Sequence, residues 1–142
     1  MESILFTGLT AMARAVACGE ISSLECVRAH WDQIDQWNPR LNAIITKDRE
    51  NASAQARKAD ESLRRDRIRG PLHGIPVTLK DSLETAGLRT TCASPHLKNH
   101  IPGEDATVVR RLRGAGAIIL GKTNLPEGCK GMQTVNSLFG RT

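Results

Sequence analysis

The sequence has no tyrosine, and aromatic residues make up only 3% of its 142 positions. Single-stranded nucleic acids bind by stacking their bases on aromatic side chains, so a nucleic-acid partner is not favoured. The sequence also lacks an apolar run of about 20 residues, the length that a membrane-spanning helix requires. No positively charged segment precedes the first apolar stretch, as it does in secretory leaders. We therefore expect a cytoplasmic protein with no membrane partner.

Paired cysteines are absent as well: none of the four forms a Cys-x-x-Cys motif. This favours free thiols in a reducing compartment over a disulfide framework. Cys92, His96 and His100 recur at intervals of four, so one face of a helix could present them to zinc. Pro95 and Pro102 argue against a helix there, and we predict no metal site.

The length suits one modest domain or part of one. Lysine and arginine outnumber acidic residues by 20 to 15, a net charge of +5, and the basic residues are densest at positions 63–69. Cations are favoured at the carboxyl end of a helix, so this run is interpreted as a solvated helix end rather than a patch for an anionic partner.

Residues 1–69 are expected to be mainly helical. A short helix is predicted over 9–17, ending near Gly19. Ser22 and Glu25 have the spacing of a capping box, and apolar residues then recur every three or four positions until Asn38-Pro39. Beyond position 49, Ala52, Ala56, Ala59 and Leu63 form a narrow apolar stripe, which indicates a helix packed closely against a neighbour.

Residues 70–142 follow a different pattern. We predict a turn at 70–74, a strand at 75–79, a long connection over residues 81–104, a helix, and a buried strand at 117–120 with a turn at 121–123. A strand, a loop, a helix and a second strand indicate an α/β fold in which helices cover a sheet.

Residues 116–123 match the phosphate-loop pattern G-x-x-x-x-G-K-[ST]. A phosphate loop needs its four variable residues in an open turn, with a helix starting at the lysine. Here those four residues are strand-like, and Pro126 and Gly128 interrupt any following helix. A nucleotide-binding domain is therefore only the third hypothesis.

Lys80 ends the short apolar segment that Gly74 and Pro76 frame. It is either a solvated cation, with Asp81 as its partner, or a base held in the interior. The residues around it, taken alone, leave both interpretations open.

Three stretches together resemble the amidase signature family of serine hydrolases. They are "GPLHGIPVTLKDSLETAGLRTTCAS" at 70–94, "DATVVRRLRGAGAIILGKTNLPE" at 105–127 and "NSLFGRT" at 136–142. The resemblance implies an α/β fold with a mixed β-sheet between helical layers, of which residues 1–142 form the N-terminal, incomplete portion. It also implies an amidase that acts on small linear carboxylic amides without a cofactor.

The family's catalytic triad consists of a serine, a serine with a cis peptide bond, and a lysine, and the matching lysine is Lys80. A lysine that takes up protons at pH 7 has to be buried, since burial disfavours its charge. We therefore expect Lys80 to be buried, near small polar groups or a cavity, and not paired tightly with Asp81.

The family's serine-rich segment normally begins just after the residues that match "FGRT", where this chain ends. Ser82, Ser94 and Ser137 lie in other contexts, so none is assigned as the nucleophile. The chain alone is expected to be inactive, with the missing C-terminal part of the domain as its partner.

By the same resemblance, Cys129, Lys130 and Met132 border the acyl pocket, and Gly128 stands where a bulky apolar residue is common. Three questions stay open: whether the chain is instead a noncatalytic remnant or interaction module, whether it forms homo-oligomers, and whether it belongs to a tRNA-dependent amidotransferase.

Overall fold

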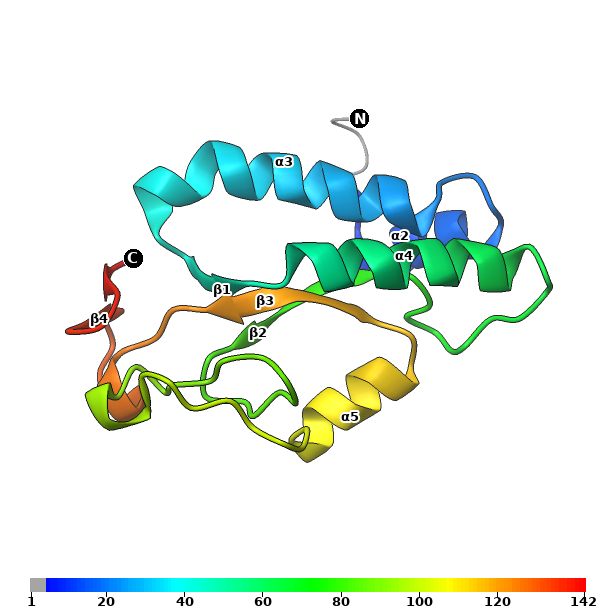
Figure 1. Ribbon diagram of the computed structural model, residues 1–142. Coiled ribbons are helices and arrows are strands. Elements are labelled where there is room, and N and C mark those ends of the chain that lie inside the picture. The colour runs from blue at the N-terminus through cyan, green and yellow to red at the C-terminus, as the bar shows by residue number, and fades with distance from the viewer. Residues whose placement is uncertain (1–4) are drawn as a thin grey trace.

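A three-stranded mixed sheet with helices on both faces is the centre of the fold (Figure 1). The computed structural model describes residues 5–142. The elements are α2 (Leu9–Ala17), α3 (Ser23–Leu41), β1 (Ile44–Lys47), α4 (Arg49–Leu63), β2 (Pro76–Lys80), the 3-10 helix η1 (Pro95–Leu97), α5 (Thr107–Gly114), β3 (Ile118–Thr123), the 3-10 helix η2 (Glu127–Cys129), and the hairpin strands β4 (Val135–Asn136) and β5 (Gly140–Arg141).

The strand order is β1-β3-β2, with β3 parallel to β2 and antiparallel to β1. The central strand β3 is buried along nearly its whole length. Strand β2 lies at the edge: on its outer side the described residues provide no further strand. The carboxyl ends of β2 and β3 meet at one end of the sheet, where Lys80 is paired with Thr123.

Successive residues of β3 face opposite layers, as the period of a strand requires. Ile118 and Leu120 pack with Trp31 and Ala52 of the layer formed by α3 and α4. Ile119 packs on the other face, against Val109 of α5. Figure 1 shows α3 and α4 side by side over one face and α5 over the other. The expected α/β fold, a mixed sheet between helical layers, is confirmed.

The first two predicted helices form where the sequence indicated. α2 ends before Gly19, which has the expected positive φ of 72°. The capping box of α3 is complete, since Ser22 Oγ accepts a hydrogen bond from the Glu25 N–H and the Glu25 carboxylate accepts one from the Ser22 N–H.

α3 ends later than predicted: it continues through Pro39 to Leu41, so the proline lies inside its last turn. At that position the proline removes a single intrahelical donor. Asn42, with a φ of 50°, then closes the helix by donating its N–H to Asn38 O at 2.7 Å. The Asn38 side chain also exchanges two hydrogen bonds with the backbone of Ile44, at 2.7 and 3.0 Å, and so fixes the start of β1.

The alanine stripe on α4 makes the close contact that the sequence predicted. Ala52 and Ala56 are fully buried against the side chains of Val27 and Trp31 on α3. Small residues allow two helices to approach closely, so this pair forms a continuous layer over the sheet.

The turn predicted at residues 121–123 is wrong, because these residues continue β3. The reason is pairing on both sides: β2 and β1, a strand that was not predicted, both pair with residues 121–123 and extend β3. Gly121 permits this pairing, since a Cβ atom at that position would lie 2.1 Å from Thr46 O. None of the helices within residues 5–142 has both the length and the apolar character needed to cross a bilayer.

Candidate functional site

Lys80 lies at the carboxyl end of β2, beside Thr123 at the end of β3. In open α/β sheets, ligands bind at the carboxyl ends of parallel strands. The long connection (residues 81–104) and the segment containing η2 both start from this end of the sheet. The candidate site is therefore built from one strand end and two loops.

Within the part of the chain that the structure describes, Lys80 is exposed. The prediction that Lys80 is buried is therefore wrong for this structure. The reason is the position of β2 at the edge of the sheet, where no neighbouring strand covers its outer side. The strand itself is well anchored, because Leu79 is buried against Ile119 and Val109.

Asp81, the next residue, is turned into the interior and has no exposed surface. Its Oδ2 atom accepts hydrogen bonds from Thr91 N at 3.0 Å and Thr91 Oγ1 at 2.5 Å. Its Oδ1 atom is buried without a hydrogen-bond partner among the described residues. The carboxylate thus fixes the long connection, and its bonds are made to Thr91 rather than to Lys80.

Two cysteines lie beside Lys80. The sulfur atoms of Cys92 and Cys129 are 3.7 Å apart. Partial burial favours the neutral Cys129 thiol, but hydrogen bonds from Ser82 and Cys92 and the charge of Lys80 together lower its pKa below the ordinary value. Burial and the hydrogen bond with Cys129 raise the pKa of Cys92. The end of β2 therefore places an amine, a hydroxyl and two thiols close together.

The other two residues assigned by resemblance face solvent. Lys130 and Met132 are exposed, and the Met132 side chain is fully solvated. Of the three residues expected to border an acyl pocket, the structure brings Cys129 toward Lys80. Gly128, in the left-handed region with a φ of 60°, forms the tight turn that places Cys129 there.

Lys122 is the buried lysine of this region, and sequence reasoning missed it. Its Nζ atom donates hydrogen bonds to Thr90 Oγ1 at 2.7 Å, to Thr85 Oγ1 at 3.0 Å, and to Leu83 O. Burial lowers the pKa of Lys122 to about 8, although nearby carboxylates, above all Asp81, act in the opposite direction. The amine binds the first half of the long connection to the central strand.

A β-bulge explains where the Lys122 side chain points. Val77 pairs with Ile119 and Thr78 with Gly121, so Leu120 is an extra residue in β3. Strict alternation would place residue 122 on the same face as Leu120, under α4. The bulge shifts it to the opposite face, where its partners in the long connection lie.

This geometry excludes the phosphate-loop interpretation. The residues between Gly116 and Gly121 form a buried strand rather than an open turn of backbone N–H groups. The Lys122 amine is enclosed by protein oxygen atoms. It has no path to a bound phosphate.

The stretch containing Cys92, His96 and His100 forms no α-helix, as its prolines predicted: its one helical segment is η1, which includes only His96 of the three. His100 Nε2 lies 3.3 Å from Glu84 Oε1. Across residues 5–142, no group of three His, Cys, Asp or Glu side chains is placed to share a metal ion.

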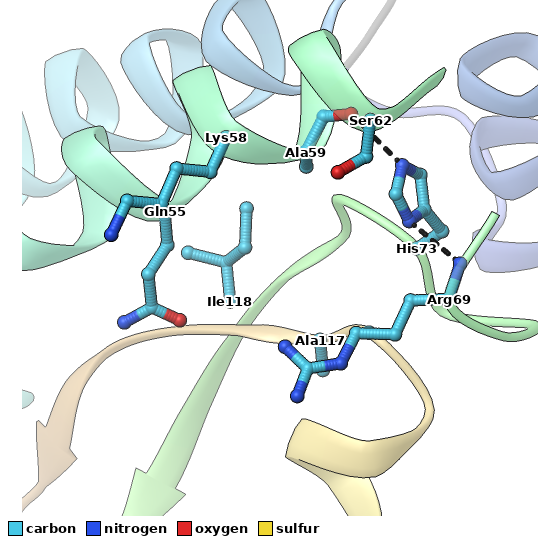
Figure 2. A pocket seen from close by; sticks show the side chains of 9 residues that line it. Gln55, Lys58, Ala59, Ser62, Arg69, His73, Ala117 and Ile118 are labelled. Carbon is cyan, nitrogen blue, oxygen red and sulfur yellow. Dashed lines mark hydrogen bonds between the residues drawn. The ribbon is translucent and has the colours of Figure 1, made fainter. Parts of the chain in front are cut away.

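A separate cavity of about 120 Å³ lies between α4 and the start of β3 (Figure 2). His73 closes one side of it: its Nδ1 atom accepts from the Arg69 N–H at 3.1 Å, which leaves Nε2 to donate to Ala59 O at 3.1 Å. Gly116 and Ile118 also line the cavity. It therefore lies at the amino end of β3, opposite the end that holds Lys80.

Known proteins resemble this chain in sequence and in fold. The family model described as Amidase matches residues 25–142. A glutamyl-tRNA(Gln) amidotransferase subunit of Carboxydothermus hydrogenoformans is 48% identical over 120 residues, which cover 84% of this chain and 25% of that protein. The chain thus spans about a quarter of the length of this relative.

Two solved structures have the same fold over nearly all of this chain. The peptide amidase PAM, solved with the competitive inhibitor chymostatin, is 34% identical with a TM-score of 0.87, covering 99% of this chain and 30% of that one. Fatty acid amide hydrolase has a TM-score of 0.95 at 24% identity, covering 99% of this chain and 25% of that one, and supports the fold alone.

Proposed function

Because the chain belongs to the amidase family, we propose that it supplies the lysine of a Ser/cis-Ser/Lys triad, Lys80, to an enzyme that hydrolyses small carboxylic amides. Membership of the family supports amide hydrolysis as the reaction class. The lysine's role rests on its place in the matched motif and at the carboxyl end of β2.

One observation carries the proposal: the acidic neighbour of Lys80 is bound elsewhere. Asp81 makes its hydrogen bonds with Thr91 in the interior. A solvated lysine at a strand end would be expected to pair with an adjacent carboxylate at the surface. Among the described residues no carboxylate pairs with the Lys80 amine, so it can still accept a proton from a hydroxyl group, as a base in a relay requires.

To act as a base, Lys80 also has to be more buried than it is among the described residues. A lysine in water has a pKa of about 10.4 and is almost fully charged at pH 7. Burial disfavours the charged form and would lower this pKa. The matched relative is about four times as long as the aligned segment. We propose that further chain of this kind packs against the free edge of β2 and covers Lys80.

In the proposed mechanism, neutral Lys80 accepts the proton of the cis-serine hydroxyl, which in turn accepts that of the nucleophilic serine. The nucleophile attacks the amide carbonyl carbon, and backbone N–H groups stabilise the oxyanion. The C–N bond then breaks: the amine leaves with the proton that Lys80 returns through the cis-serine, and an acyl-enzyme forms. Water then hydrolyses the acyl-enzyme. Both serines belong to the family's serine-rich segment and are expected outside residues 1–142.

The exposure of Lys80 favours a second hypothesis, a noncatalytic module that keeps the fold without the chemistry. A chimera separates the two. This chain would replace the matching 30% of the peptide amidase PAM, and ammonia release from a peptide amide would be measured. The same chimera would carry Lys80→Ala, with Lys98→Ala, an exposed lysine of the long connection, as the matched control.

The triad proposal expects turnover by the chimera and by its Lys98→Ala form, and loss of turnover with Lys80→Ala. Circular dichroism and chymostatin binding would show whether the chimera is folded. A chimera that is folded but releases no ammonia would support the noncatalytic module. Equal turnover with and without the Lys80 amine would show that another group is the base.

A further inference from the structure

Cys92 and Cys129 are 37 residues apart in sequence, yet the fold holds their segments together by backbone hydrogen bonds. Gly128 N donates to Cys92 O at 3.0 Å, and Cys92 N donates to Asp81 O at 3.1 Å. Both cysteines adopt left-handed backbone conformations, with φ values of 51° and 61°. The thiol contact is therefore fixed by the backbone on both sides.

We propose that Cys92 and Cys129 form a reversible disulfide when a peroxide oxidises the protein, which makes this pair a redox modification site beside Lys80. The sulfur atoms are 3.7 Å apart, and a disulfide bond is about 2.05 Å long. They need to approach by roughly 1.7 Å, a distance within reach of side-chain rotation.

The two thiols differ in a way that assigns their roles. Cys129 is exposed, and its pKa is lowered against the effect of burial by Ser82, Cys92 and Lys80. Thiolate character and access determine which cysteine reacts first with an oxidant. Cys92 is less exposed and its pKa is raised, mainly by burial. Cys129 is thus the attacking thiol, and Cys92 resolves the intermediate.

The steps balance with hydrogen peroxide as the oxidant. The Cys129 thiolate attacks one peroxide oxygen, the O–O bond breaks, and a sulfenic acid and hydroxide form; the hydroxide takes up the proton that the Cys129 thiol released and becomes water. The Cys92 sulfur then attacks the sulfenic sulfur, the S–S bond forms, and the departing hydroxide takes up the thiol proton as water. Two thiols lose two electrons, and one peroxide becomes two water molecules.

The other two cysteines do not share these features. Cys26 is buried in the core formed with Met12 and Ile75, and burial raises its pKa to about 11. Cys18 is exposed. Between residues 5 and 142, Cys92 and Cys129 are the one pair of cysteine thiols within hydrogen-bonding distance of each other. Oxidation should therefore select this pair.

The disulfide changes the surroundings of Lys80. In the reduced protein, the Cys129 sulfur interacts with the Lys80 amine and the Ser82 hydroxyl. Oxidation removes its thiolate form and ties the η2 segment to the long connection. The proposal itself depends only on the thiol geometry and stands apart from the amidase activity.

The test uses the 142-residue chain, reduced, desalted and then treated with a small excess of hydrogen peroxide. Free thiols are counted with DTNB after denaturation, and linked peptides are identified by mass spectrometry. We expect the count to fall from four to two, a Cys92–Cys129 peptide two hydrogen masses lighter, and full recovery with dithiothreitol.

Three variants assign the roles. Cys129→Ser should leave Cys92 as a thiol, Cys92→Ser should leave a sulfenic acid on Cys129 that dimedone traps, and Cys18→Ser should form the disulfide like the parent chain. The same oxidation in 8 M urea should give mixed pairings, since only the folded chain holds the two sulfur atoms together.

Four thiols persisting after treatment would overturn the proposal. So would intermolecular dimers as the main product on a non-reducing gel, or the same pairing preference in urea, since neither would depend on the geometry of the fold. If a serine variant unfolds, the urea comparison on the parent chain still decides the question.

Discussion

The Nζ atom of Lys122 lies 2.7 Å from Thr90 Oγ1, so a lysine of the central strand directly binds the loop that follows the edge strand. Its other two bonds go to Leu83 O and Thr85 Oγ1. Three oxygen acceptors match the three N–H donors of a protonated amine. The nearby Asp81 carboxylate adds favourable charge to this network.

Lys122→Met is predicted to destabilise the chain by about 3 kcal/mol, because removal of the amine leaves the buried Asp81 carboxylate without its compensating charge. Urea unfolding followed by circular dichroism measures this. Lys98→Met, at an exposed position, is the control and should change stability by less than about 0.5 kcal/mol. Adding Asp81→Asn to Lys122→Met should recover part of the loss, and strict additivity of the two changes would contradict the coupling.

The stability of the parent chain should rise with pH relative to Lys122→Met. The pKa of Lys122 is about 8 in the folded state and near 10.5 when unfolded, so between these values the unfolded chain binds more protons. Stability then increases with pH across this window, by an amount on the order of 1 to 3 kcal/mol. Unfolding curves at pH 7.5 and 10 for both proteins test this. Because both proteins contain the same cysteines, the contribution of cysteine ionisation to the pH dependence cancels in the difference between them. Parallel curves would show that Lys122 keeps its ordinary pKa.

Gly121→Ala should destabilise the sheet, because the new Cβ would lie 2.1 Å from Thr46 O and would separate β1 from β3. We expect a loss of about 3 kcal/mol, at the upper end for overpacked sites. Gly114→Ala is the matched control: it lies at the end of α5 with no atom within 4 Å of the added Cβ, and it should stabilise the chain by about 0.5 kcal/mol or more. Equal stability of the two variants would show that β1 can move away at no cost.

The features that the sequence predicted correctly depend on neighbours a few residues away. The capping box of Ser22 and Glu25 involves residues three apart, and the contact of Ala52 and Ala56 follows from the period of a helix. The family's motifs placed Lys80 at the end of a strand in the same way. Each of these features is determined by residues that are close together in the sequence.

The features that were wrong or missed depend on distant parts of the chain. Whether Lys122 points inward is decided by a bulge at Leu120, and whether residues 121–123 form a turn is decided by their pairing with both β1 and β2. The position of the bulge and the pairing of residues 121–123 both depend on strand register, which the local sequence does not determine. The burial of Lys80 depends on what packs against the edge of β2, so the strand's own apolar pattern could not determine it.

The 142-residue chain alone is predicted to release no ammonia from simple amides above the rate without protein. The proposed nucleophile and oxyanion donors lie in the serine-rich segment, and the loss of one oxyanion donor alone can cost about 100- to 1,000-fold in rate.

Mixing the chain with a peptide amidase that lacks its matching 30% should restore turnover, because the free edge of β2 offers an uncovered sheet edge for that remainder to pair with. In the mixture, Lys80→Ala should reduce the rate at least about 100-fold, the usual contribution of a positioned base. Lys98→Ala should leave it unchanged, and size-exclusion chromatography would show whether each variant still binds the remainder. Turnover by the chain alone, or a complex whose rate is insensitive to Lys80→Ala, would place the chemistry on other residues.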